Sequence, residues 1–196
     1  MMTELLSTPD FLAWAAARGI DYDPRYPRSE SLAFVTAPGH WRFWEPPPKL
    51  GELAWFVGLV LDTVAADGDL LVFPHHTGHW HSGGGGAPSV NDAQDVVVRG
   101  AGIPPGFVGA ARFAPSERAA VVAVAVASLV FGWGASQDLY FVPAHGRALL
   151  LTEHDEVISG AFPTQVELQE FTARLVARGY ADPDAAAGAN TDEHAI

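Results

Sequence analysis

The chain has 196 residues, of which 48% are hydrophobic, 17% charged and 11% aromatic. This length suits one domain, or at most two small ones, and the apolar content is enough for a sizeable core, so the chain need not be disordered. Eleven basic residues face 23 acidic ones, and because the formal charge is −12 we expect neither nucleic acid nor a membrane as partner. The sequence contains no cysteine, which excludes a disulfide framework, a thiolate metal site and a cysteine nucleophile.

The N-terminal residues 1–5 have neither a basic segment nor an apolar core, so the sequence predicts no signal peptide. The longest apolar run, 119–131, is shorter than the roughly 20 residues that a membrane-spanning helix needs. We therefore expect a cytoplasmic protein. Its arginines outnumber its single lysine, Lys49, which is typical of a GC-rich bacterial genome.

The first half of the chain shows helix and strand patterns in turn. Ser7 and Pro9 are typical of a helix start, and Gly19 of its end. Apolar residues at helical spacing predict the clearest helix of the chain over 50–65. Short strands are expected around these helices, over 31–36, 41–45 and 69–73.

The second half contains an apolar helix and a closing run of strands. A strand over 106–114 precedes residues 114–130, whose β-branched residues fit a strand but whose length favours a helix. Thr164 and Glu167 form a capping box for a last helix that ends at Gly179. Before it come three strand-like segments whose short connections predict antiparallel neighbours, over 138–142, 147–151 and 156–161.

These elements predict an α+β fold in a single domain over residues 1–180. We expect a mainly antiparallel sheet of about five or six strands packed against three or four helices. Residues 181–196 are small, acidic and without pattern, and are expected to form a flexible C-terminal tail. The broad aromatic face of the helix over 50–65 would also suit a homodimer interface.

Four histidines lie close together in a long loop over 74–90: His75, His76, His79 and His81. Imidazole is the commonest neutral metal ligand, and a His-x-His pair on an extended chain points both rings to one side. The cluster fits an open site for a divalent transition metal such as zinc, which would activate water. The alternative is an exposed histidine-rich loop without a ligand, and in that case no cofactor is expected.

A dense aromatic block offers a candidate binding surface in Trp41, Arg42 and Trp44. Strand alternation would put Trp41 and Phe43 on one face, and Arg42 and Trp44 on the other. Aromatic residues and arginine are enriched in binding hot spots. Large aromatic rings most often bury, so our favoured interpretation is that all three rings fill the core.

An expected hairpin turn supplies three further candidate binding residues, His154, Asp155 and Glu156. A histidine beside carboxylates has a raised pKa and can act as an acid, a base or a ligand. The same charged residues are also typical of any solvated hairpin turn.

Three blocks of the chain resemble small uncharacterised bacterial proteins: Trp41 to Pro46, Phe131 to Tyr140, and the hairpin at Thr152 to Asp155 with its following helix. The resemblance covers most of residues 5–180. Some acidic α+β proteins of this kind resemble immunity proteins that neutralise toxins. This resemblance implies a basic protein partner, and it lends no catalytic residue to this chain.

Two functions are therefore expected from the sequence. The first is a non-catalytic acidic binding protein, of the immunity or regulatory type, whose charge steers a basic protein partner. The alternative is a metal-dependent hydrolase that uses the cluster His75–His81, with a carboxylate from 153–156 as base. No complete catalytic motif favours the enzyme.

Overall fold

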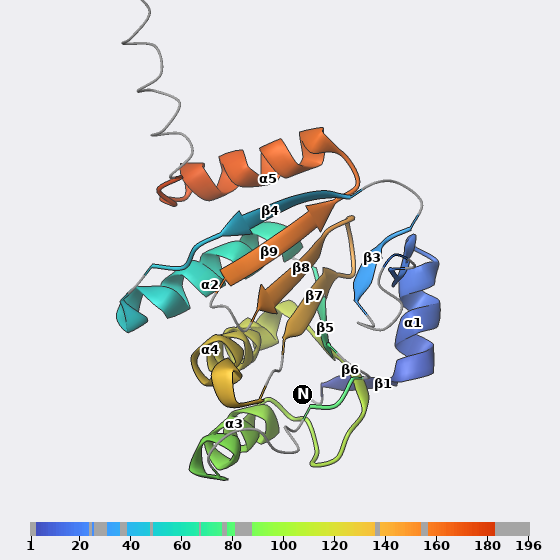
Figure 1. The fold of residues 1–196 in the computed structure, drawn as a ribbon, viewed down its shortest axis with the longest axis vertical. Helices are drawn as coiled ribbons and strands as arrows, with labels where there is room; N and C mark the ends of the chain where they lie inside the picture. The colour runs from blue at the N-terminus through green and yellow to red at the C-terminus, as the bar shows by residue number, and fades with distance from the viewer. Residues whose placement is uncertain are drawn as a thin grey trace, which may run out of the picture.

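The structure, a computed structural model, describes residues 3–23, 25, 31–35, 39–47, 49–66, 68–75, 78–80, 88–135, 138–153 and 157–182. Within these ranges the chain forms five α-helices, one short 3-10 helix, a seven-stranded sheet and a two-stranded sheet (Figure 1). The α+β class is confirmed. The expected numbers of strands and helices were too low.

The large sheet is built from strands that lie far apart in the sequence. They are β1 (Glu4–Ser7), β4 (His40–Trp44), β5 (Leu70–Pro74), β6 (Gly109–Phe113), β7 (Leu139–Pro143), β8 (Leu149–Glu153) and β9 (Val157–Phe162). Their order across the sheet is β1-β6-β5-β7-β8-β9-β4, and each neighbouring pair is antiparallel. The expected run of three antiparallel strands is confirmed in β7, β8 and β9.

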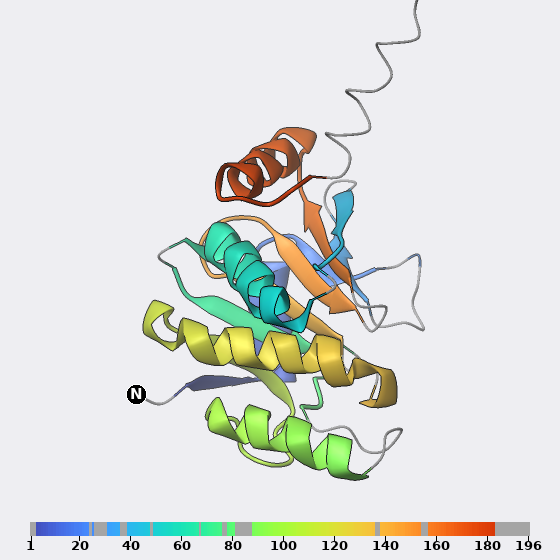
Figure 2. The same cartoon turned by 90° about the vertical axis from the view of Figure 1, so that its left-hand side faces the viewer.

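Helices cover one face of the sheet. Figure 2 shows α5, α2, α4 and α3 side by side across it. Their bounds are α2 (Leu50–Ala65), α3 (Pro88–Gly100), α4 (Arg118–Ala135) and α5 (Gln165–Ala177). The 3-10 turn Pro115–Glu117 leads into α4. None of the helices in the described ranges is long and apolar enough to cross a bilayer.

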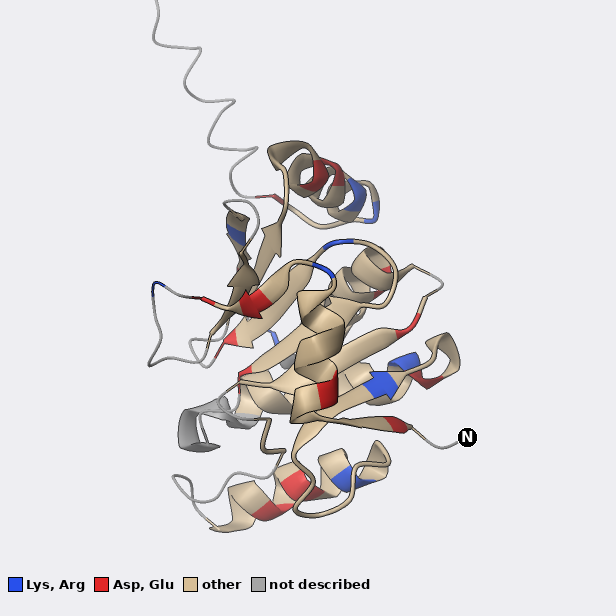
Figure 3. Ribbon diagram, turned by 90° about the vertical axis from the view of Figure 1, so that its right-hand side faces the viewer, with Lys and Arg blue, Asp and Glu red and all other residues tan. Residues whose placement is uncertain are grey.

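The opposite face carries helix α1 (Thr8–Ala16) and the small hairpin of β2 (Ile20–Tyr22) and β3 (Leu32–Phe34). Figure 3 looks onto this face and shows that charged residues lie mainly on helices, in loops and near strand ends. The central strands β5 and β7 contain no charged residue and are buried along their whole length. The molecule therefore has three layers, with the sheet in the middle.

Local capping explains where α1 and α5 begin. The Oγ atom of Ser7 accepts a hydrogen bond from the backbone N–H of Asp10 at 3.3 Å, at the start of α1. Thr164 Oγ1 accepts one from the backbone N–H of Glu167 at 3.2 Å, at the start of α5. Gly179 follows α5 with a φ of 105°, a left-handed conformation that favours glycine. Both expected helices are confirmed.

Two strands escaped the sequence patterns because they are short and lack apolar alternation. Three of the four residues of β1 are exposed, and β1 is held by its pairing with β6. The three-residue strand β2 is held in the same way by β3. Long-range pairing, rather than a local pattern, therefore makes both segments strands.

Candidate functional site

Strand β4 carries the aromatic block and lies at one edge of the large sheet. The expected alternation along the strand is confirmed. Trp41 is 39% exposed and Phe43 61% exposed, whereas Trp44, on the other face, is fully buried. The interpretation that all three rings fill the core was wrong for Trp41 and Phe43, because the layer on their side of the sheet leaves these rings exposed.

The residues of β4 that face α5 bind within the molecule itself. Trp44 packs edge-on against Phe171, with ring centroids 5.3 Å apart. Gly160 on β9 leaves room for this ring, since a Cβ atom there would lie 2.7 Å from it. Arg42 forms an ion pair with Asp182, beyond the end of α5. Trp44 and Arg42 therefore fix β4 in place, and Trp41 and Phe43 form its outward surface.

Acidic residues gather at the end of the sheet where β4 finishes. Glu45 follows β4 and is exposed. Glu153 is the last residue of β8 and pairs with Val157 of β9. Ile158, which follows Val157 in β9, pairs with Trp44 at the end of β4. The three candidate residues of the hairpin turn lie between β8 and β9 in the chain but outside the described residues: His154, Asp155 and Glu156. The register thus brings the chain on both sides of that turn close to the end of β4.

The structure describes His75 and His79 of the histidine cluster, while His76 and His81 lie outside the described residues. No three His, Asp or Glu side chains of the described ranges are arranged to hold a metal ion. The metal site, which needs the whole cluster, stays a prediction.

His75 has neighbours on the side of the sheet covered by α1. Its Nε2 atom lies 3.2 Å from Ser31 Oγ, and its ring meets the ring of Tyr140 edge-on at 5.5 Å. His79 is exposed and forms an isolated bridge with Val108. A metal on His75 Nε2 would have to displace the contact with Ser31.

A second candidate region, which the sequence patterns did not predict, surrounds the C-terminal end of α2. Two adjoining hollows meet there and share Thr63, Ala66 and Arg174. We call the first the mixed-charge pocket; its volume is about 710 Å³. Its polar lining includes Thr63, Asp69, His145, Glu167, Glu170 and Arg174.

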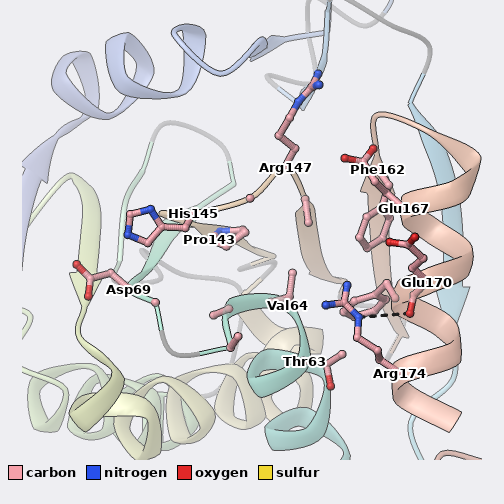
Figure 4. A pocket seen from close by; sticks show the side chains of 16 residues that line it. Thr63, Val64, Asp69, Pro143, His145, Arg147, Phe162, Glu167, Glu170 and Arg174 are labelled. Carbon is pink, nitrogen blue, oxygen red and sulfur yellow. Dashed lines mark hydrogen bonds between the residues drawn. The ribbon is translucent and has the colours of Figure 1, made fainter. Parts of the chain in front are cut away.

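Three elements bring these side chains together: the end of α2, the turn between β7 and β8, and α5. Figure 4 shows His145 and Asp69 on one side of the mixed-charge pocket, and Glu167, Glu170 and Arg174 on the opposite side. Both sides of the pocket thus carry a carboxylate and a nitrogen-containing side chain. Such a lining suits a polar ligand better than an apolar one.

We call the second hollow the arginine hollow; its volume is about 670 Å³. It is lined by Asp62, Thr63, Pro115, Arg118, Arg174 and Arg178. Burial lowers the pKa of Arg118 below its ordinary value, whereas Asp62 and Asp69 act in the opposite direction. The guanidinium remains a cation, because the ordinary pKa of arginine is far above neutrality.

The sequence held a signal for this region. Arg118 stands at the start of an otherwise apolar helix, and Arg174 and Arg178 are spaced to share one face of α5. Nothing in the sequence shows that the two helices meet beside α2.

No protein-family model, curated protein or solved structure matches this chain. Its function is therefore inferred from its own residues.

Proposed function

We propose that this chain is a non-catalytic binding protein that holds a basic protein partner on the edge strand β4. The observation that carries the proposal is the exposure of two large rings on that strand, Trp41 at 39% and Phe43 at 61%. Neither ring belongs to the two buried apolar clusters of the described core. Aromatic side chains supply a large contact area and are enriched in binding hot spots.

The backbone of β4 offers a second means of binding. Within the described part of the chain, β9 is the only strand that pairs with β4, so its outer edge has no strand neighbour. Such an edge accepts an extended segment of another chain as an additional strand. Main-chain hydrogen bonds would then align that segment beside Trp41 and Phe43.

Charge indicates the kind of chain that would bind. The formal charge is −12, and Glu45 and Glu153 lie at the end of the sheet where β4 finishes. An acidic surface raises the association rate of a basic partner and disfavours an acidic one. A basic toxin of the type that immunity proteins neutralise, or another basic regulatory target, fits these requirements.

A pull-down from the native host at low salt tests the proposal. The wild-type chain is compared with the double variant Trp41→Ser/Phe43→Ser, and Trp55→Ser is the matched control because Trp55 is 49% exposed on α2. We expect wild type and control to retain the same basic protein, identified by mass spectrometry, and the double variant to lose it. Purified partner and chain should then bind directly, and added salt should slow their association.

Three outcomes would contradict the proposal, provided that circular dichroism shows each variant to be folded. One is the absence of any basic partner, and another is equal capture by the double variant. The third is dimerisation of the purified chain that the double variant abolishes, since a second copy of this acidic chain would then occupy β4.

A further inference from the structure

The lining of the arginine hollow is positively charged, whereas the chain as a whole is negatively charged. Three of its lining residues are arginines, Arg118 at the start of α4 and Arg174 and Arg178 at the end of α5. Asp62 is the only carboxylate among the described lining residues, so the lining has a net formal charge of +2. The chain as a whole has a charge of −12. Such a concentration of cations attracts anions locally.

Arg118 is the most deeply placed of the three arginines, with 13% of its side chain exposed. Its Nη2 donates to the carbonyl oxygen of Gly68 at 3.0 Å, and its Nε lies 3.4 Å from Asp62 Oδ1. Its Nη1 is buried and has no hydrogen-bond partner within the described residues. A buried charged donor left without a partner is costly, and the same guanidinium group borders the arginine hollow.

Arg174, in the last turn of α5, and Arg178, the residue that follows this helix, add further donors. Arg178 Nη1 donates to Thr63 Oγ1 at 3.0 Å, which ties the end of α5 to α2. Arg174 is held through its Nε alone, which donates to the carbonyl oxygen of Glu170 at 3.3 Å (Figure 4). Both Nη atoms of Arg174 have no partner among the described residues and lie at the junction of the two hollows.

We propose that the arginine hollow binds the phosphate group of a small phosphorylated molecule. A phosphate monoester carries a charge of about −1.5 to −2 at pH 7 and three strong acceptor oxygens. This charge matches the net charge of +2 of the lining, and arginine forks match the geometry of phosphate oxygens. A ligand with a single carboxylate would pair with only one guanidinium group and would neutralise only one of the two positive charges.

The mixed-charge pocket would receive the rest of the ligand, because the two hollows share Thr63, Ala66 and Arg174. Glu167 and Glu170 line its far side and supply acceptors for hydroxyl or ammonium groups. The ligand class is therefore a phosphorylated molecule with a hydroxyl or amino group on its other end.

Arg174 and Arg178 also stabilise the protein by themselves, since cations near the C-terminal end of a helix interact favourably with the helix dipole. The hydrogen bonds of Arg118 to Gly68 and of Arg178 to Thr63 add structural roles for these two residues. They leave both Nη atoms of the exposed Arg174 without a hydrogen bond among the described residues, and these are the donors that a phosphate in the hollow would take.

Isothermal titration calorimetry in a phosphate-free buffer tests the site. The probes are inorganic phosphate, glycerol 3-phosphate and phosphoethanolamine, each compared with its unphosphorylated counterpart where one exists. We expect saturable binding of one molecule per chain. The two esters should bind more tightly than inorganic phosphate, while glycerol and ethanolamine should show no measurable binding.

Arg174→Gln is the decisive variant because Arg174 is exposed and its loss removes no contact between helices. Arg99→Gln is the matched control, since Arg99 Nε donates to the carbonyl oxygen of Asp95 at 3.2 Å in the same arrangement on α3. We expect Arg174→Gln to weaken phosphate binding about tenfold or more and Arg99→Gln to leave it unchanged.

Arg118→Gln should weaken binding at least as much, and if this variant fails to fold the comparison of Arg174→Gln with Arg99→Gln still decides. Acetate serves as an additional probe. The proposal is overturned if no phosphate probe binds saturably, if Arg174→Gln and the control Arg99→Gln lose affinity equally, or if acetate binds as tightly as phosphate. None of the substituted residues lies on β4, so the result is independent of the proposed protein partner.

Discussion

The two faces of the large sheet are covered to different extents. Four helices lie on one face and enclose a cluster of 30 buried apolar residues of the described chain, whereas the cluster under α1 and the β2–β3 hairpin has 12. Most of the core therefore lies on the helical face. On the other face the cover is incomplete at β4, where Trp41 and Phe43 remain exposed.

This difference separates the stabilising face of β4 from the face that we propose for binding. Trp44 points to the well-covered face and stabilises the fold, while Phe43, its neighbour in the chain, points to the open face and is available to a partner. Substitutions on the two faces should consequently have effects of very different size.

The largest effect is expected for Trp44→Ala. This change removes a fully buried ring that packs against Phe171, and it leaves a cavity between β4 and α5. We expect the free energy of unfolding to fall by about 3–5 kcal/mol, measured by urea denaturation. A loss below about 1 kcal/mol would show that the helical face is packed less tightly than its burial indicates.

The next effect concerns the layer of α1 and the β2–β3 hairpin. High pH should reduce the stability that Tyr140 contributes beneath this layer. Its hydroxyl accepts a hydrogen bond from the backbone N–H of Leu32 at 3.1 Å, which joins the hairpin to the sheet. Burial raises the pKa of Tyr140 to about 12, with hydrogen bonds from Leu32 and Ser31 acting in the opposite direction.

Because tyrosine in an unfolded chain has a pKa near 10, the contribution of Tyr140 is fully present below about pH 10 and is lost as pH rises to about 12. The loss should amount to roughly 2–3 kcal/mol. The free energy of unfolding of wild type should fall more steeply over this range than that of Tyr140→Phe. Parallel curves for the two proteins would refute the assignment.

A smaller effect is expected from the helix caps, one on each face. Ser7→Ala removes the cap of α1, and Thr164→Ala removes the cap of α5. Each should cost about 1 kcal/mol, visible as a lower Tm. Hydrogen exchange should accelerate mainly in the first turn of the affected helix, and equal acceleration in both helices would show that the two layers open together.

The smallest effect on stability is expected for Phe43→Ser, because 61% of this side chain is already exposed. The free energy of unfolding should change by no more than about 0.5 kcal/mol in the same urea experiment as Trp44→Ala. A loss as large as that of Trp44→Ala would mean that Phe43 belongs to the core and would remove the basis of the docking surface.

Local patterns predicted most of the helices and the closing run of strands. The apolar spacing of 50–65 is a property of neighbouring residues, and so are the capping residues Ser7 and Thr164. The short connections between β7, β8 and β9 likewise imply antiparallel pairing without any knowledge of the rest of the fold.

The sequence by itself determined which residues share a face of each element, because that depends only on helical or strand periodicity. It put Trp41 and Phe43 on one side of their strand, but only the tertiary structure decided that this side is open. It showed Arg118 in an apolar helix, but only the packing of α2, α4 and α5 brought that residue beside Arg174. Contacts between distant elements decide which face of a strand is covered and which cations lie together. No local sequence pattern encodes these contacts.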